Sequence, residues 1–136
     1  METPLREWIV GIDHVGIRVR ELGRARAFYE QLGFELVAGP LGSEPVAILE
    51  HPSGVCVNFI LNARADRERN VLMDGDDKWP GYTHLALRVE SLDDVERHLR
   101  ARRIEITEGP VSFPVGRSLF VRDPDRNVIE FHQPNV

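Results

Sequence analysis

The chain has 136 residues, of which 42% are hydrophobic and 29% are charged. A chain of this length buries about two-thirds of the surface that its unfolded form exposes, which is enough for one compact domain. The net charge is −5, and no basic run is long enough to offset it, which disfavours a nucleic-acid-binding function.

The single cysteine, Cys56, cannot form an internal disulfide, and no apolar stretch approaches the length of a membrane span. The N-terminal sequence Met-Glu-Thr-Pro has neither the basic start nor the apolar run of a secretion signal. We therefore expect a cytoplasmic protein that binds neither nucleic acid nor membranes. Cys56 is expected to be a buried, unreactive thiol.

The first predicted unit covers about residues 8–62. Residues 9–19 alternate Ile and Val with small or polar residues, which predicts a half-buried strand. Apolar residues at helical spacing over 22–32 predict a helix that ends at Gly33. Turn-forming clusters then separate three strands, at 34–38, 46–50 and 55–61. The order of elements is βαβββ.

Residues 63–80 are polar with little periodicity, which predicts a linker, part of which could cover a site as a lid. The second unit, about residues 81–134, repeats the order of the first. A strand at 83–89 precedes a helix for which Ser91 is the expected N-cap. Three strands follow, at 104–108, 118–122 and 127–133.

The two units are copies of one pattern. At a shift of 70 residues, Ile12–Val19 falls on Tyr82–Val89, and Gly39-Pro40 falls on Gly109-Pro110. With two further residues of slippage, Asn58-Phe59 falls on Glu130-Phe131. The repeat predicts an α+β fold of tandem, pseudo-symmetric βαβββ modules.

His14, His84 and Glu130 occupy corresponding places in the two copies, so they can converge. Two imidazoles and one carboxylate on separate strands can bind a divalent metal ion and leave the remaining coordination positions open, as in catalytic sites. The alternative is that both histidines are hydrogen-bonded within the sheets and that Glu130 is a strand-edge acid. The symmetric placement of all three favours the metal site.

Other polar residues share the predicted ligand face. His132 lies two residues after Glu130, where it could orient the ligands or act as an auxiliary acid or base, or be a strand-end histidine half in water. Asn58 stands where a fourth ligand would be, and we expect it to bind substrate or a metal-bound water. Arg18 and Asn62 would suit a carboxylate-bearing substrate, with paired surface arginines, Arg18 and Arg88, as the alternative.

Two aromatic residues near His84 are candidates for the substrate pocket. Trp79 and Tyr82 would form part of its wall, although packing in the core accounts for aromatic residues equally well.

Four segments together resemble the vicinal oxygen chelate superfamily, which includes glyoxalase I, extradiol dioxygenases, and the fosfomycin and bleomycin resistance proteins. These segments are Ile12–Val19 with His14, Ala27–Glu35, Tyr82–Leu87 and Val121–Glu130. The resemblance covers nearly the whole chain, and it implies paired βαβββ modules that form a curved mixed sheet around a cleft. It also implies a divalent metal that is chelated by two vicinal oxygens of a small substrate.

Within this resemblance, His14, His84 and Glu130 match three metal-ligand positions, and Asn58 falls on the fourth. Glu130 could serve as both ligand and base. A two-histidine, one-carboxylate site favours Fe2+ or Mn2+, with Zn2+ or Ni2+ as alternatives. Family members often form homodimers, in which the site is completed either within one chain or between two.

The resemblance leaves the reaction open. The intact ligand set favours dioxygenase chemistry, although Phe120 stands where extradiol dioxygenases have an active-site tyrosine. Arg18 and Asn62 match residues that hold glutathione in glyoxalase I, which keeps a lyase or isomerase, or a thiol transferase, as an alternative. The third possibility is a metal-free, bleomycin-resistance-type protein that binds a small molecule.

Overall fold

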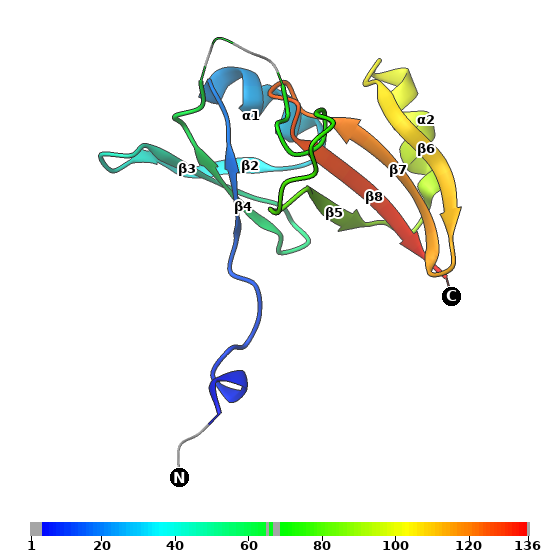
Figure 1. The fold of residues 1–136 in the computed structure, drawn as a ribbon, viewed down its shortest axis with the longest axis horizontal. Helices are drawn as coiled ribbons and strands as arrows, with labels where there is room; N and C mark the ends of the chain where they lie inside the picture. Colours follow the sequence, from blue (N-terminus) through cyan, green and yellow to red (C-terminus); the bar gives the residue numbers. More distant parts are fainter. Residues whose placement is uncertain (1–3, 65, 67–68, 136) are drawn as a thin grey trace.

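The computed structural model describes residues 4–64, 66 and 69–135, which form two modules of the same order (Figure 1). The first module contains β1 (Val15–Arg18), α1 (Leu22–Gln31), β2 (Glu35–Leu41), β3 (Val46–Glu50) and β4 (Cys56–Ile60). The second contains β5 (His84–Arg88), α2 (Leu92–Ala101), β6 (Ile106–Phe113), β7 (Gly116–Arg122) and β8 (Val128–Pro134). The predicted α+β fold of two βαβββ modules is therefore confirmed.

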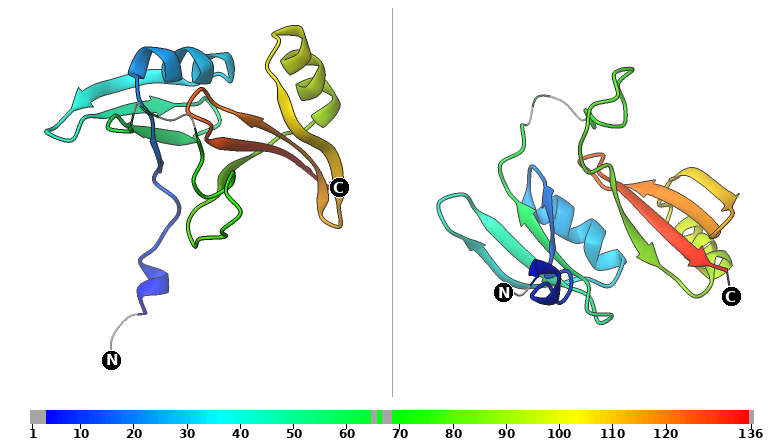
Figure 2. Two further views of the ribbon diagram at one scale, coloured as in Figure 1. Left: turned by 45° about the horizontal axis from the view of Figure 1, so that its top comes forward. Right: turned by 60° about the horizontal axis from the view of Figure 1, so that its bottom comes forward.

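Each module forms one mixed, four-stranded sheet with its helix on one face (Figure 2). The strand orders are β1-β4-β3-β2 and β5-β8-β7-β6. In both sheets the first strand pairs in parallel with the last, and the other pairs are antiparallel. We call the face of each sheet that lies opposite its helix the open face.

Strand alternation divides the side chains between the two faces. In β4, Val57 and Phe59 are fully buried toward the helix side, and in β7 the same holds for Leu119 and Val121. These residues belong to one hydrophobic core that both modules share. The alternate positions, which carry most of the predicted site residues, consequently lie on the open faces.

The helix boundaries follow the predicted signals. Gly33 has a φ of +98°, a left-handed conformation that glycine adopts without steric cost, and it follows directly after the end of α1. Ser91 caps α2, because its side chain accepts a 3.2 Å hydrogen bond from the backbone N–H of Asp94.

A polar junction joins the modules behind the sheets. Tyr29 on α1 is fully buried, and its hydroxyl donates a 2.8 Å hydrogen bond to Oδ2 of Asp123 in the turn before β8. Burial, and then the charge of Asp123, raises the pKa of Tyr29 well above its ordinary value, so the phenol remains a donor. In the same turn, Asp125 accepts hydrogen bonds from Nε of Arg20 at 3.0 Å and Nη2 of Arg24 at 2.9 Å.

The strand predicted at 9–19 is shorter in the structure, where β1 begins only at Val15. It is shorter because β4, the strand that pairs with β1, begins at Cys56 and is preceded by a turn. The preceding residues form a short 3-10 helix, η1 (Leu5–Glu7), with no buried residue, and then an extended stretch. This N-terminal segment projects away from both modules on the side opposite α1 (Figure 1; Figure 2, left).

The strand predicted at 104–108 continues further, because β6 extends to Phe113. It stays paired with β7 through a shift in register between Glu108 and Val111.

The predicted linker contains no helix or strand among its described residues, and 65, 67 and 68 lie outside the described part. Its second half is attached to the second module by hydrogen bonds from Nδ2 of Asn70 to the carbonyl of Arg126 and from Nη2 of Arg122 to Asp74. Within the part of the chain that the structure describes, no helix is long and apolar enough to cross a membrane.

Candidate functional site

The closest pair of predicted ligands is His84 and Glu130, on the open face of the second module. Adjacent parallel strands β5 and β8 carry them, with Glu130 opposite Ala86. Nε2 of His84 lies 2.9 Å from Oε1 of Glu130, and the two side chains are 35% and 13% exposed. The imidazole of His84 is therefore accessible from the open face, while the carboxylate of Glu130 is mostly buried against the sheet.

Both side chains of this pair have further partners. Nδ1 of His84 lies 2.8 Å from the hydroxyl of Thr83, and the ring of Phe120 meets the imidazole edge-on at 6.1 Å between centroids. Phe120 on β7 is directly opposite Glu130. These contacts fix the plane of the imidazole and leave Nε2 toward the carboxylate.

The second carboxylate oxygen of Glu130 is occupied by a residue that sequence analysis missed. The fully buried Ser118 donates a 2.6 Å hydrogen bond to Oε2 of Glu130, and its hydroxyl lies 2.7 Å from Nδ1 of His132. His132 and Glu130 lie on the same face, with Nδ1 of His132 3.7 Å from Oε2 of Glu130 and the serine hydroxyl in contact with both. The signal that could have found Ser118 is strand alternation, which places it on the same face as Phe120.

His14 lies elsewhere. It precedes β1, its Nδ1 is 2.7 Å from Oδ1 of Asp13, and it lines a cavity of about 650 Å³ on the open face of the first module. Among the described residues, no group of three His, Cys, Asp or Glu side chains is close enough to hold a metal ion. A single chain thus brings together two of the three predicted ligands and leaves His14 apart from them.

The first-module cavity also contains Asn58 and Cys56. Sγ of Cys56 lies 3.9 Å from the side-chain oxygen of Asn58. The prediction of a buried thiol was wrong, because Cys56 falls on the open face and is only partly buried. Desolvation, followed by the charges of Glu50 and Asp13, raises the pKa of this thiol, which therefore remains protonated.

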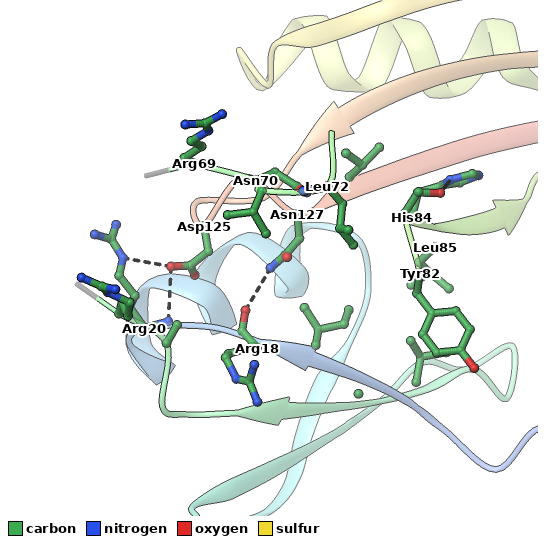
Figure 3. Close-up of a pocket in the computed structure, with 18 of the residues that line it drawn as sticks. Arg18, Arg20, Arg69, Asn70, Leu72, Tyr82, His84, Leu85, Asp125 and Asn127 are labelled. Atoms are coloured by element: carbon green, nitrogen blue, oxygen red, sulfur yellow. Dashed lines mark hydrogen bonds and ion pairs between the residues drawn. The ribbon is translucent and has the colours of Figure 1, made fainter. Parts of the chain in front are cut away.

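A larger cavity, of about 780 Å³, lies between β1, β5 and the linker (Figure 3). Tyr82 and His84 line one end of it, and the His84 ring points away from Arg18 and Asp125 at the other end. Linker residues 69–72 line the same cavity, beside the strand that carries His84.

The other predicted substrate-binding residues form one hydrogen-bonded pair and two exposed aromatic side chains. Nε of Arg18 donates a 2.9 Å hydrogen bond to Asn62, which in turn donates to Glu44 at 2.6 Å, so Arg18 and Asn62 do lie together. Trp79 and Tyr82 are 64% and 101% exposed, which rules out core packing as the reason for these aromatic residues within this chain.

The His84–Glu130 separation suits a metal site. Two ligand atoms at right angles, each about 2.1 Å from an ion, are about 3 Å apart, close to the 2.9 Å observed. Imidazole nitrogen and carboxylate oxygen are the ligands that Fe, Mn and Zn ions share. This part of the chain can therefore supply two adjacent ligands with little rearrangement.

Comparison with known proteins agrees with this architecture. A family model described as the Glyoxalase/Bleomycin resistance protein/Dioxygenase superfamily matches residues 11–131. The chain belongs to this superfamily. It is 29% identical over 124 residues to the glyoxalase domain-containing protein RDO1 of Mycosarcoma maydis, covering 88% of this chain and 65% of the length of that relative.

Two solved structures share the fold. TnmS3, an antibiotic-binding protein from Streptomyces sp. CB03234, matches with a TM-score of 0.72 and 24% identity over 93% of this chain and 98% of its own. The fosfomycin resistance protein FosX from Listeria monocytogenes, in complex with Mn(II) and sulfate, matches with a TM-score of 0.66 and 20% identity over 94% and 93% of the two chains. Proteins that share this fold thus include an antibiotic-binding protein and a resistance protein in complex with Mn(II).

Proposed function

We propose that this chain is a divalent-metal enzyme that acts on a small substrate with two adjacent oxygen atoms. His84 and Glu130 of one chain would bind the ion together with His14 of a second copy. The observation that carries the proposal is the 2.9 Å approach of the His84 and Glu130 ligand atoms on an open face.

Within one chain His14 lines a different cavity from His84, which supports a third ligand supplied by a second copy of the chain. The open faces support this, because on β1 and β5 the residues that point away from the helices are exposed. In a two-fold dimer the first module of each chain would face the second module of its partner and form two equivalent sites.

The N-terminal segment gives independent support for a homodimer. Trp8, Ile9, Val10 and Ile12 are 67%, 65%, 97% and 87% exposed in the single chain. Consecutive large apolar residues at this exposure are typical of a surface that another molecule covers. The segment leads directly into His14, so a partner that covers it also lies near this ligand.

The other site residues have roles that their positions support. A bound ion would supply Lewis-acid activation of the substrate oxygens. Glu130 would act as ligand and proton acceptor, and His132 would hold the proton network beneath it. The Arg18–Asn62 pair would bind an anionic group of the substrate.

Aromatic residues and one amide would complete the substrate cavity. Phe120, which contacts His84, would pack against an apolar part of the substrate, as would the exposed Tyr82 and Trp79. Asn58 on the opposite module would donate a hydrogen bond to substrate or to a metal-bound water.

We favour Fe2+ or Mn2+ as the ion, with Zn2+ or Ni2+ as alternatives. A two-histidine, one-carboxylate set leaves positions open for substrate and oxygen, which suits Fe2+ and Mn2+. The structural likeness to the Mn(II) complex of FosX supports the same choice. We favour dioxygenase chemistry over glyoxalase-type isomerisation or thiol transfer. Isomerisation would use a second carboxylate for proton transfer, and the amide of Asn58 cannot take that role.

The competing function is metal-free binding of a small molecule. The likeness to the antibiotic-binding protein TnmS3 and the cavity of about 780 Å³ favour it. In that case His84, which lines this cavity, would contact the ligand directly, and no ion would be retained.

Metal analysis distinguishes these functions. The purified protein, reconstituted anaerobically with Fe2+, is expected to retain about one ion per chain. His84→Ala should lose the ion, while His98→Ala on α2, far from Glu130 in the sheet, should retain it. Oxygen uptake with a panel of catechols, run beside a hemithioacetal isomerisation assay, then decides between the reactions. A chain that binds no ion but takes up an apolar ligand tightly would contradict the enzyme proposal.

A further inference from the structure

Ser118 lies beneath the His84–Glu130 pair, and its hydroxyl has two polar neighbours. It is fully buried, 2.6 Å from Oε2 of Glu130 and 2.7 Å from Nδ1 of His132. A serine hydroxyl has one hydrogen, which it donates to the carboxylate, so it accepts from the imidazole N–H. The direction of each hydrogen bond in the chain His132–Ser118–Glu130 is therefore defined.

The hairpin of β7 and β8 sets this arrangement. Its register places Ser118 directly opposite His132 and Phe120 directly opposite Glu130. The next residues along each strand point into the core, so the four side chains form one polar and aromatic patch on the open face.

The first module shows that the fold does not require this hydroxyl. The equivalent pairs in β3 and β4 are Val46 opposite Ile60 and Ile48 opposite Asn58. An apolar pair thus occupies the place of Ser118 and His132 in the module that carries no carboxylate ligand. The serine and histidine accompany Glu130, and backbone geometry alone does not account for them.

We propose that Ser118 is a positioning residue that makes Glu130 a one-oxygen ligand. The hydroxyl already donates to Oε2, which favours Oε1 as the atom that binds the ion, and Oε1 lies 2.9 Å from Nε2 of His84. This inference rests on the proposed metal-binding function. Its consequence is that one more coordination position stays open for substrate than if both carboxylate oxygens bound the ion.

The effect of losing the hydroxyl follows from this geometry. In Ser118→Ala, Oε2 loses its donor, and the carboxylate can rotate or bind the ion through both oxygens. Removal of such an outer partner typically weakens metal binding by about 10- to 100-fold. Ser118→Thr keeps the hydroxyl on a side chain suited to strands, so it should bind metal close to the wild-type strength.

The test titrates the 136-residue chain with Mn2+ alone and follows binding by calorimetry and by infrared difference spectra of the carboxylate stretches. These spectra distinguish one-oxygen from two-oxygen coordination. Wild type should show the one-oxygen pattern, and Ser118→Ala should bind about 10- to 100-fold more weakly with an altered pattern. Thr107→Ala removes a hydroxyl that donates to the backbone carbonyl of Phe120 and should match wild type.

Each outcome is decisive. A wild-type protein that binds no Mn2+ overturns the metal function and this inference with it. A wild-type protein that binds Mn2+ through both carboxylate oxygens overturns the role of Ser118 alone, even if Ser118→Ala fails to fold. Unchanged affinity and spectra in a folded Ser118→Ala variant overturn it equally.

Discussion

The hydroxyl of Tyr29 donates a 2.8 Å hydrogen bond to Asp123, and this bond joins the helix of the first module to the last turn of the second. Asp123 is 2% exposed and also accepts from the backbone N–H groups of Asp125 and Asn127. Burial raises the pKa of Asp123, while these hydrogen bonds oppose the rise. A buried carboxylate with several donors is therefore one of the contacts that set the relative position of the modules, beside the shared core and the bonds to Asp125.

Tyr29→Phe should destabilise the protein by about 1–3 kcal/mol, because it removes a donor to a buried carboxylate and leaves the ring in place. Chemical denaturation followed by circular dichroism measures this change in the free energy of unfolding. Tyr82→Phe is the matched control, since Tyr82 is fully exposed, and it should change the stability little. Equal effects of the two substitutions would contradict the role of the Tyr29–Asp123 bond.

Asp74 and Arg122 attach the linker to the second module through a 2.8 Å ion pair. The hydrogen bond from Arg122 lowers the pKa of Asp74, so its contribution to stability is present above the unfolded-state value and is lost as the pH falls through the folded-state value. Because Asp74 is about a third exposed, Asp74→Asn should cost only about 0.5–1 kcal/mol at pH 7.

The pH dependence of this cost is the direct check. Unfolding titrations from neutral pH downward should show the two proteins converging as the pH falls below about 3.9, the usual value for aspartate. A difference that stays constant to the lowest pH at which both proteins fold would contradict the ion pair as its source.

The fold was predictable because its signals are local and occur twice. The alternation at Val57 and Phe59 and the helix end at Gly33 are visible in the sequence, and the repeat predicts the same order for the second module. The true start of β1 was not predictable, because residues 9–14 have strand-like composition but no neighbouring strand among the residues that the structure describes. The composition of a segment indicates that its side chains suit a buried strand, but it does not identify the strand or molecule that would cover them.

The site was predicted in part for the same reason. His84 and Glu130 lie on adjacent strands of one sheet, so the fold of a single module is enough to bring them together. His14 directly precedes β1 in the other module, and its distance from them depends on how the modules and copies assemble. Ser118 has no motif of its own, and only the register of the hairpin gives it a role.

The N-terminal segment should contribute to dimerisation. Trp8→Ser removes a large apolar side chain that is 67% exposed in the single chain, and we expect it to weaken the dimer by at least about tenfold. Sedimentation velocity over a range of concentrations measures this change. Leu41→Ser alters an apolar residue that is 54% exposed on β2, the edge strand furthest from β1, and should leave the dimer intact. A monomeric wild type would contradict the shared site.

Mixing two inactive variants tests most directly whether the metal site is shared between chains. His14→Ala and His84→Ala should each fail to bind the ion as a homodimer. If ligands come from both chains, a heterodimer of the two variants carries one intact site and one that lacks both histidines. Equal amounts, unfolded and refolded together, should regain about a quarter of the wild-type ion content, since half of the dimers are heterodimers. If refolded mixtures regain no ion while each variant still forms dimers, the shared site is contradicted.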